Sequence, residues 1–588
     1  MHKQTGCVKI GLSFLLLVAT AASLVGQEPD SHAKDSPLWC KHTILVYVNP
    51  SGAYLDLWTT ENLKRLAAYC DAQGRPQDLF FDGFLLIGFG CKGGRHLLPL
   101  ADRKPALMSD WQDTIRNYLT VMERLGDAFE EVAGALNKPE AKGKVILAMP
   151  HPDPRQRSFG PVNGGSLDLS NDPDRVRAMA WYIDESIRQW QEREKRGALK
   201  RVALVGFYWG HEAIGEADVE VVKGTAAHVH EMGLLLHWIP CYGGGRKDWK
   251  EIGLDCVTQQ INYQNPQKPG RPLTIFDVIT GRVAKDGMHG VEMTPMARTT
   301  DLNPRVWSWH QVHLANLEAA LRLKWNEFPA MTYFHGGDLP QIAADPQTRV
   351  FYDDLYKWVK GTLTQQDVEA LAAATLAEQK RAGVINDEWY AKIAAAKTVL
   401  EKLQLMEEPK LEALRKAEAE RLAPLTQSSG NLLKDGSFER GLEDWPRRSG
   451  DVARSQETSA DGGWSLRLSL EPGAGSEMIR AFAKSVRVPV RPGQAVRLRA
   501  RVRLPQDLQE TQRGLMIGLS RFQEGKCLAT WTECEIGRVE ATADGWQCLT
   551  LHLFVDDKPC DEVEAIIGAC GVGAAYVDDV ELVTLSRP

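Results

Sequence analysis

The chain has 588 residues, too many for one hydrophobic core, so we expect two or three domains. Hydrophobic residues make up 43% of it and charged residues 25%, which is ordinary for a soluble globular protein. The net charge of -7 argues against nucleic-acid binding, because phosphate recognition needs a concentrated basic face.

The N-terminus has the features of an export signal. Lys3 and Lys9 flank the start of an apolar stretch over residues 10–25, and the bond between Gly26 and Gln27 is a plausible cleavage site. The stretch is short for a membrane span. We therefore expect a signal peptide over residues 1–26 and a secreted or periplasmic protein without stable membrane insertion after cleavage. An uncleaved N-terminal anchor is the alternative.

The cysteines suggest disulfides. Ten of the 11 cysteines follow the signal, an even number for an oxidising compartment. Since no C-x-x-C spacing occurs, we do not expect a zinc site. Five cysteines crowd into the last part of the chain, where we expect one or two disulfides of open connectivity: Cys527, Cys534, Cys548, Cys560 and Cys570.

Residues 40–360 alternate short apolar segments with longer amphipathic ones, a pattern typical of parallel βα units. Eight strands are expected, at Ile44–Val48, Gly83–Gly88, Lys144–Pro150, Arg201–Tyr208, Leu234–Pro240, Cys256–Tyr263, Gly290–Thr294 and Ala330–His335. A helical pattern follows each strand, at Leu57–Gln73, Asp110–Leu136, Pro173–Arg196, Asp218–Met232, Arg246–Ile252, Thr274–Asp286, Asn303–Trp325 and Pro346–Trp358. This order predicts an α/β fold, a (β/α)8 TIM-type barrel. A doubly wound open sheet is the rival, but no glycine-rich dinucleotide fingerprint follows the first strand.

Two further segments follow the barrel. Residues 361–427 are rich in Ala, Glu, Lys and Leu and predict a helical spacer of two or three helices packed on the barrel, broken near Gly383 and Pro409. Residues 428–588 change to alternating apolar and polar residues and predict an all-β jelly-roll sandwich. Its expected strands are Trp464–Leu470, Ala481–Val490, Gln494–Val502, Gly514–Phe522, Trp546–Phe554 and Tyr576–Leu585.

Two glutamates stand where a barrel enzyme places its active site, at the C-terminal ends of the strands. Glu212 follows the fourth expected strand, and Glu292 lies in the seventh. Glycosidases need two carboxyl groups, one to protonate the leaving oxygen and one to attack the anomeric carbon or activate water. The placement resembles the large clan of retaining barrel glycosidases, which implies Glu212 as general acid/base and Glu292 as nucleophile. His211 stands where that clan commonly has Asn, which leaves a different division of roles open.

Aromatic and polar residues at the other strand ends are candidates for the walls of a sugar-binding cleft. They are Tyr208, Trp209, His211, Trp238, Tyr242, Gln260, Asn262, Tyr263, Tyr333, His335 and Asp338. Asp338 is also a reserve third carboxylate. His151 and Asp153 are weaker candidates, and Asp82, at the opposite end of its strand, is expected to be structural. For two or three of the aromatics, core packing is the alternative. We expect no cofactor for catalysis.

Several of these segments resemble a known family. They are Gly206–Glu212, the stretch Trp238-Ile239-Pro240-Cys241-Tyr242, Gly253-Leu254-Asp255, Gln259-Gln260-Ile261-Asn262-Tyr263, Phe81-Asp82-Gly83-Phe84 and Gly290-Val291-Glu292. Over 41–360 the chain resembles the uncharacterised bacterial proteins grouped as domain of unknown function 4855. The resemblance implies a barrel of glycosidase-like type and says little about substrate. Ile261 departs from the expected pattern, which has Pro there.

The C-terminal part resembles a carbohydrate-binding jelly roll. The segment Asn431–Glu439 is similar to the opening of such modules, and Tyr576–Leu582 to their closing strand. In these modules the two ends meet, and carboxylates there hold a structural Ca²⁺ through oxygen ligands. Glu439 and Asp579 are the candidate metal ligands, with Asp435 and Asp578 as further candidates; capping of turns is the alternative.

Three functions follow from these patterns. The first is an exported glycoside hydrolase whose substrate is a poly- or oligosaccharide. The second is a non-catalytic glycan-binding protein with a degenerate barrel. The third is a barrel enzyme such as a deacetylase or polysaccharide lyase; the absence of a His-rich metal cluster at the strand ends counts against its metal-dependent form, and no G-x-S-x-G nucleophile motif occurs. The sequence specifies neither the sugar nor the oligomeric state.

Overall fold

The protein consists of two compact units, residues 1–410 and residues 411–588. In the computed structural model the described residues are 40–100, 103–162, 164–241, 245–261, 263, 273, 275–294, 309–334, 338–460, 462–470, 481–503, 515–528, 537–538, 545–569 and 573–588. The predicted signal peptide lies outside them. No helix in these ranges is long and apolar enough to span a membrane.

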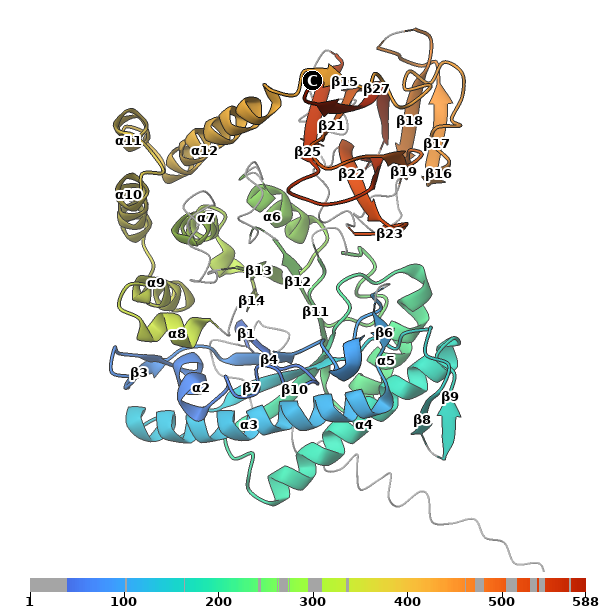
Figure 1. The fold of residues 1–588 in the computed structure, drawn as a ribbon. Coiled ribbons are helices and arrows are strands. Elements are labelled where there is room, and N and C mark those ends of the chain that lie inside the picture. Colours follow the sequence, from blue (N-terminus) through green and yellow to red (C-terminus); the bar gives the residue numbers. More distant parts are fainter. Residues whose placement is uncertain are drawn as a thin grey trace, which may run out of the picture. The chain divides into compact units, whose positions relative to one another are not determined.

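The first unit contains a closed barrel of eight parallel strands (Figure 1). All eight predicted strands are confirmed, and they adjoin one another in chain order, with the last pairing to the first. The strands are β1 (His42–Tyr47), β4 (Gly83–Ile87), β7 (Gly143–Met149), β10 (Val202–Trp209), β11 (Leu235–Trp238), β12 (Cys256–Gln260), β13 (Gly290–Met293) and β14 (Met331–Tyr333). The carboxyl ends of all strands therefore open on one rim.

Helices surround the barrel and cover the outer faces of its strands. They are α2 (Thr60–Ala67), α3 (Met108–Leu136), α4 (Asp172–Lys195), α5 (Val219–Glu231), α6 (Ile275–Lys285), α7 (Trp309–Arg322), α8 (Leu339–Ala344) and α9 (Arg349–Val359). Short elements lie between them: β2 (Ala68–Cys70), β3 (Pro76–Leu79), η1 (Lys92–Gly94), β5 (Arg95–His96), β6 (Lys104–Pro105), β8 (Phe159–Val162), β9 (Gly165–Leu167), η2 (Glu216–Asp218) and η3 (Trp325–Glu327).

The structure differs from the predicted helices at two places. The helix expected over Leu57–Gln73 ends at Ala67, and its second half forms the β2–β3 hairpin. The hairpin turn contains Gly74 at a φ of +79°, a conformation that favours glycine and stops a helix. The short helix expected over Arg246–Ile252 is a run of turns instead.

Three helices follow the barrel: α10 (Gln365–Arg381), α11 (Asp387–Ala394) and α12 (Val399–Leu422). Gly383, at a φ of +68°, follows the end of α10, as the sequence predicts. The predicted break at Pro409 is wrong, because α12 continues through this residue, which is buried. Val368, Leu371 and Leu403 join the barrel's hydrophobic core, so these helices pack on the barrel.

The second unit contains a sandwich of two antiparallel sheets, which confirms the predicted all-β sandwich. One sheet has β15 (Gln427–Ser428), β17 (Asp451–Ser455), β18 (Ser465–Leu470), β21 (Ala495–Arg503), β25 (Gln547–Phe554) and β27 (Gly573–Ser586). The other has β16 (Arg447–Ser449), β19 (Ala481–Lys484), β20 (Val488–Pro489), β22 (Leu515–Gln523), β23 (Lys526–Cys527), β24 (Gly537–Arg538) and β26 (Glu562–Ala569). The sequence missed β26, whose nearly continuous burial hides the alternation of a half-exposed strand.

Five of the described cysteines form no disulfide. Cys70, Cys91, Cys256, Cys548 and Cys560 are free thiols. Two of these five belong to the C-terminal group in which disulfides were expected, while Cys534 and Cys570 lie outside the described residues. Burial raises the pKa of Cys70 to about 11 and that of Cys91 to about 12, so both behave as inert core residues.

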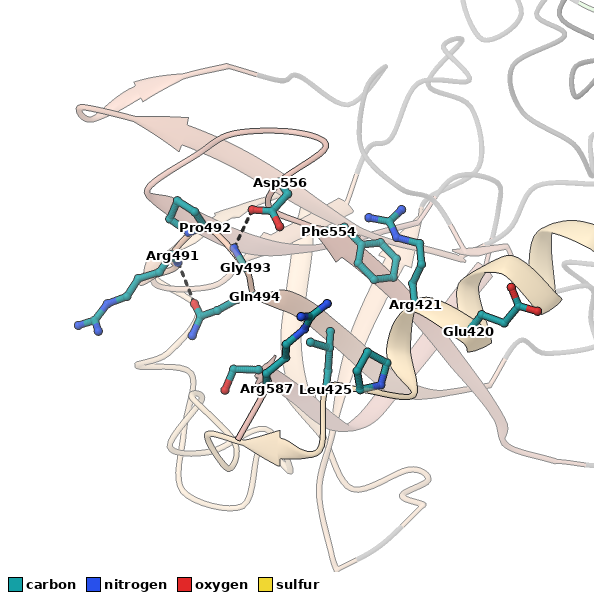
Figure 2. A pocket seen from close by; sticks show the side chains of 12 residues that line it. Glu420, Arg421, Leu425, Arg491, Pro492, Gly493, Gln494, Phe554, Asp556 and Arg587 are labelled. Atoms are coloured by element: carbon teal, nitrogen blue, oxygen red, sulfur yellow. Dashed lines mark hydrogen bonds between the residues drawn. The ribbon is translucent and has the colours of Figure 1, made fainter.

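A cavity of about 840 Å³ opens in the second unit between the end of α12 and the edge of the sandwich (Figure 2). Its floor includes the turn from Arg491 to Gln494, held by hydrogen bonds from the Arg491 amide to the Gln494 side chain and from the Gly493 amide to Asp556. The aromatic ring in its wall, Phe554, has the Arg421 guanidinium 3.6 Å from its centroid. Because this face of the ring is covered, we do not assign the cavity a sugar-stacking role.

Candidate active site

His211 and Glu212 follow the end of strand β10 and lie at the rim of the barrel. The register of this strand shifts between Leu204 and Gly206, a bulge that re-aims the residues after it. Gly206 and Gly210 allow this part of the chain to pack closely against the neighbouring strands. A Cβ on Gly210 would lie 2.6 Å from the carbonyl oxygen of Met149 in β7. Glu212 is half-buried just past the strand end.

Strand β13 carries Glu292, which is only 4% exposed. In the barrel ladder Glu292 lies beside Gln260 of β12 on one side and Thr332 of β14 on the other. Thr332 belongs to a hydrogen-bonded chain that crosses to Thr258 and His237, from strands β12 and β11. Register partners in parallel strands point to the same face, so Glu292 points into the barrel with them.

Gln260 connects the two glutamates. It is the ladder neighbour of Glu292, and its side chain lies close enough to the Glu212 carboxyl to lower the pKa of that group against the effect of burial. Only 7% of Gln260 is exposed, so this contact is made away from bulk water. The two carboxyl groups predicted from the sequence therefore share one buried region at the mouth of the barrel.

The two carboxyl groups interact electrostatically. Burial, and then the negative charge of Glu212, raise the pKa of Glu292 well above its ordinary value. Burial also raises the pKa of Glu212, while the hydrogen bond from Gln260 and the charge of His211 oppose that rise. Like charges that interact in a buried region oppose each other's ionisation, so the pKa of each glutamate is raised, and that of Glu292 is raised the more strongly.

Two tyrosines, the buried Tyr208 and the half-buried Tyr47, interact electrostatically with the pair. Burial and the charges of both glutamates raise the pKa values of Tyr47 and Tyr208 well above the ordinary range. Both phenols thus stay protonated and can donate hydrogen bonds to a carboxylate or a sugar hydroxyl. Tyr208 was among the predicted site residues. Tyr47 was not, although it ends the first strand and its position at a strand end is the signal that would have found it.

Tyr54 is a second residue that the sequence analysis missed. It lies in the loop between β1 and α2, its side chain is 47% exposed, and its backbone φ is +69°, unusual for a bulky residue. Tyr54 is close enough to Tyr47 to raise its pKa, which places it near the same rim. A strained, exposed aromatic beside a polar site is a candidate sugar platform.

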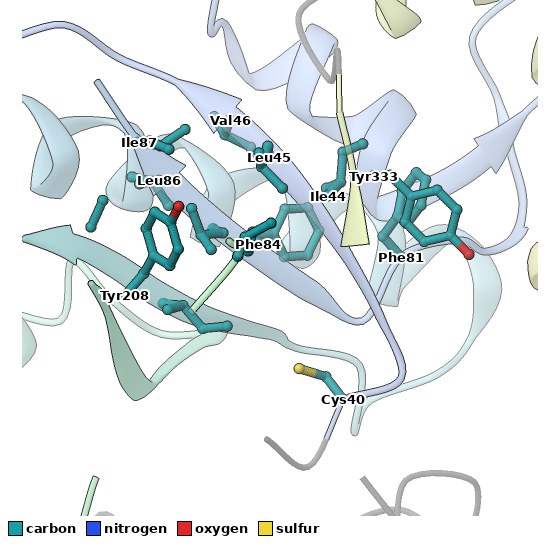
Figure 3. Close-up of a cluster of buried hydrophobic side chains, with 14 of the residues drawn as sticks. Cys40, Ile44, Leu45, Val46, Phe81, Phe84, Leu86, Ile87, Tyr208 and Tyr333 are labelled. Atoms are coloured by element: carbon teal, nitrogen blue, oxygen red, sulfur yellow. The ribbon is translucent and has the colours of Figure 1, made fainter. Parts of the chain in front are cut away.

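Several predicted aromatics belong to the core. The Trp238 indole donates a hydrogen bond to the His211 carbonyl and so supports the loop of Glu212 from beneath. Tyr263 is 4% exposed and donates to Glu407 of α12. Tyr333 accepts a hydrogen bond from the Trp358 indole and makes another with His42, far along the cluster from Tyr208 (Figure 3).

The remaining predicted site residues lie at several places. Trp209 is 1% exposed and packs edge-on to His151 at 5.9 Å. Asp338 occupies the N-cap position of α8. Asp82 accepts hydrogen bonds from the Lys41 and His42 amides and fixes the start of β1, which confirms its structural role. Tyr242, Asn262 and His335 lie outside the described residues.

A group of His151, His211 and Asp218 also meets at this rim. Each offers a possible ligand atom, and these atoms lie within 4.8 Å of one another. The sequence analysis found no His-rich cluster at the strand ends; the structure corrects this, because His151 follows β7 and His211 follows β10. Asp153, two residues after His151, forms an ion pair with Arg155 in which Asp153 Oδ2 lies 2.6 Å from Arg155 Nη2.

The predicted calcium ligands of the sandwich accept backbone hydrogen bonds. The ends of the module do meet, since Asn431 bonds the backbone of Val580 and Leu582. Glu439 accepts from the amides of Gly463 and Trp464, each at 2.8 Å, and Asp579 is exposed. The further candidates Asp435 and Asp578 also accept amide hydrogen bonds. Among the described residues, the sets of three potential ligands that converge do not include these acids.

Fold and site together define a (β/α)8-barrel protein with a buried carboxyl pair at the strand ends, followed by helices and a β-sandwich. A family model described as domain of unknown function (DUF4855) matches residues 42–357. The match spans more than half of the chain, and the chain belongs to this family, as the sequence segments implied. No curated protein matches the chain.

Solved structures give weaker likenesses. One titled "Glycoside hydrolase" is 9% identical, covering 90% of this chain and 92% of its own, at a TM-score of 0.28. A family 16 carbohydrate-binding module is 17% identical over 26% of this chain and 99% of its own, at 0.21. The CBM22-1 xylan-binding domain from Paenibacillus barcinonensis is 17% identical over 26% and 93%, at 0.19. TM-scores this low do not support the assignment of a function to this protein.

Proposed function

We propose that this protein is a glycoside hydrolase that cleaves a poly- or oligosaccharide with Glu212 and Glu292. One observation carries the proposal: Glu292, which is 4% exposed at the end of β13, lies beside Gln260 in the barrel ladder and interacts electrostatically with Glu212, which follows the end of β10. Glycosidic hydrolysis requires two neighbouring carboxyl groups, one that gives a proton and one that acts as nucleophile or base.

The proposed reaction retains configuration. The Glu292 carboxylate forms a bond to the anomeric carbon while the glycosidic C–O bond breaks and the Glu212 proton passes to the leaving oxygen. Water then attacks the same carbon, Glu212 takes a proton from it, and the Glu292 ester bond breaks. Because burial and the charge of Glu212 raise the pKa of Glu292, this division of roles requires that Glu292 be ionised and Glu212 protonated once sugar is bound.

The first test is turnover. Full-length protein is incubated with a panel of soluble polysaccharides, and new reducing ends are measured alongside retardation of the protein in gels that contain each polysaccharide. We expect reducing ends from at least one polysaccharide. Retardation without product across the panel would favour the non-catalytic glycan-binding alternative.

A second test assigns the roles. Glu212→Ala and Glu292→Ala are assayed on an activated aryl glycoside of the cleaved sugar with added azide. We expect Glu212→Ala to give a glycosyl azide of retained configuration, because azide replaces water in the second step. Glu292→Ala is expected to give the inverted azide. The opposite pairing of variant and product would exchange the two roles.

Export, carbohydrate recognition by the sandwich and a structural calcium ion stay proposals. The sandwich topology supports a carbohydrate-binding role, because its two ends meet as in the modules that it resembles. The apolar stretch at the N-terminus supports export. N-terminal sequencing of the protein recovered from the producing cells tests cleavage after Gly26.

A further inference from the structure

We propose that Trp238 and Gln259 are positioning residues that hold the main chain of Glu212 in place and so direct its carboxyl toward the leaving oxygen. Both side chains act through the backbone around Glu212 and not on the sugar. The inference rests on the proposed role of Glu212 in hydrolysis, and it adds to that role two residues that lie behind the barrel wall.

Both side chains lie on the outer side of the barrel wall. Side chains alternate between the two faces of a strand, and His237 in β11 and Gln260 in β12 point into the barrel. Their neighbours Trp238 and Gln259 therefore point outward, into the layer between strands and helices. Both are 0% exposed. Polar N–H groups buried in such a layer need hydrogen-bond acceptors, and both side chains find them on the backbone.

The Trp238 indole holds the peptide group that precedes Glu212. Its Nε1–H donates to the His211 carbonyl oxygen at 3.0 Å. Because this oxygen belongs to the peptide bond that joins His211 to Glu212, the hydrogen bond restrains the plane of that bond. The donor is fully buried, so water does not compete for it, and the carbonyl would lose its partner if the N–H were removed.

The peptide group that follows Glu212 is held as well. The Cys241 amide, in the loop after β11, donates to the Glu212 carbonyl oxygen at 3.2 Å. Gln259 holds this loop, because its Nε2 donates to the carbonyl oxygens of Pro240 at 3.0 Å and Cys241 at 2.9 Å. The Gln260 amide donates to the same Pro240 oxygen at 3.1 Å. The end of β12 therefore fixes the loop whose amide fixes Glu212.

Both peptide planes that flank the Glu212 Cα are thus restrained. A residue has only two soft backbone torsions, and restraint of the planes on either side limits both of them and fixes the direction of its Cα–Cβ bond. Glu212 itself belongs to no helix or strand, so these hydrogen bonds take the place of a sheet ladder. A displacement of about 1 Å in a reacting group costs about a hundredfold in rate, so the restraints bear on proton transfer.

Trp249 provides a matched comparison. Its indole is 2% exposed and donates to the Asp286 carbonyl oxygen at 3.0 Å. Asp286 lies between the end of α6 and the start of β13, so this hydrogen bond is at the end of the barrel away from the carboxyl pair. Trp238→Phe and Trp249→Phe each remove one buried indole N–H and keep an aromatic ring, but only the first releases the backbone at Glu212.

The kinetic test compares two leaving groups on full-length protein. Dinitrophenol leaves from an aryl glycoside of the cleaved sugar without a proton, whereas phenol needs the proton of Glu212. We expect Trp238→Phe and Gln259→Met each to lower kcat/KM on the phenyl glycoside about tenfold to hundredfold, with kcat/KM on the dinitrophenyl glycoside within about twofold of wild type. Trp249→Phe should match wild type on both. A loss of folded protein would lower both values equally.

A structural test needs no activity. Crystal structures of wild type and the three variants without sugar locate the Glu212 carboxyl. We expect it to move by about 0.5–1 Å in Trp238→Phe and Gln259→Met and to stay in place in Trp249→Phe. An unmoved carboxyl in all variants, or equal losses on both glycosides, would overturn the proposal. If wild type cleaves neither glycosides nor polysaccharides, the proposed function fails, and the crystal structures still decide whether Trp238 and Gln259 position Glu212.

Discussion

At the scale of single residues, the site depends on a few buried hydrogen bonds. Gln260 is the clearest case, because one amide from β12 supports Glu212 of β10 beside Glu292 of β13. The sequence identified these three residues from their places at strand ends. It did not identify Tyr47, because the approach of this side chain to both glutamates arises only when the first strand closes the barrel.

Gln260→Leu removes the donor to Glu212. The pKa of Glu212 is expected to rise further, and turnover to fall roughly tenfold to hundredfold, because an uncompensated buried carboxyl is a poorer acid. Initial rates across pH measure both effects. Gln365→Leu, on the exposed start of α10, is the control. A Gln260→Leu protein that folds and turns over at the wild-type rate would remove this residue from the site.

Tyr54→Gly separates binding from stability. Glycine accepts a φ of +69°, so the free energy of unfolding is expected to stay within about 1 kcal/mol of wild type. Loss of the exposed ring is expected to weaken polysaccharide binding about fivefold. Gel retardation and thermal unfolding measure the two quantities. Leu414→Ala, another exposed apolar residue, should change neither. Unchanged retardation in Tyr54→Gly would show that no sugar stacks on this ring.

At the scale of elements, the barrel strands were predictable and the pieces between them less so. Each strand is an apolar run bounded by turn residues. Because the strands are buried on both faces, this continuous apolar pattern is easy to recognise in the sequence. The helix predicted through Tyr69 and Cys70 failed because tertiary pairing with β3 outweighs helical periodicity there. Pro409 shows the converse, since packing of α12 keeps helical a position where local preference favours a break.

Two glycine-to-alanine substitutions compare a tightly packed position in the barrel with an open position on a helix. A Cβ on Gly290 of β13 would lie 1.8 Å from the Ala330 carbonyl oxygen, so Gly290→Ala is expected to cost about 3 kcal/mol or more. Gly281 lies inside α6 with nothing within 4 Å, and Gly281→Ala is expected to stabilise by about 0.5–1 kcal/mol. Denaturant unfolding measures both changes. Equal effects of the two substitutions would contradict the packing described for β13 and β14.

The contact between α12 and the barrel is pH-sensitive. Burial raises the pKa of Glu407 to about 8 from an ordinary 4.5, and burial lowers that of Lys410 to about 8. Between about pH 4.5 and 8 the unfolded chain releases the Glu407 proton and the folded protein keeps it, so stability falls as pH rises through this window. The Lys410 shift acts only above about pH 8, where it makes stability rise with pH.

Glu407→Gln should flatten this dependence. We expect the fall in Tm between about pH 5 and 8 to be a few degrees smaller than in wild type. The side chain keeps its size and can still accept from Tyr263. Glu408→Gln, its exposed neighbour, is the control. An identical pH dependence in wild type and Glu407→Gln would mean that Glu407 ionises normally in the folded protein.

At the scale of the whole molecule, the two compact units are expected to unfold in two calorimetric transitions, each with its own hydrophobic core. The order of barrel, helices and sandwich follows from composition along the chain. The five free thiols among the described residues show the limit of such counting, because an even number of cysteines does not say which of them pair.

The proposed calcium ion predicts a selective effect on one transition. A chelator is expected to lower the Tm of the sandwich by several degrees and leave the barrel transition unchanged, because an ion bound only to the folded unit stabilises it. Glu439→Gln should abolish that response. A sandwich transition indifferent to chelator would show that Glu439 and Asp579 only cap turns.

The most direct test of the proposed catalytic pair is the activity of Glu212→Gln and Glu292→Gln on whichever polysaccharide the wild-type protein cleaves. Each substitution keeps the shape of the side chain and removes its proton chemistry, so each is expected to lower turnover by about 1,000-fold with little change in Tm. Glu220→Gln, an exposed carboxylate on α5, should retain full activity. Wild-type turnover in either active-site variant would contradict a catalytic pair formed by Glu212 and Glu292.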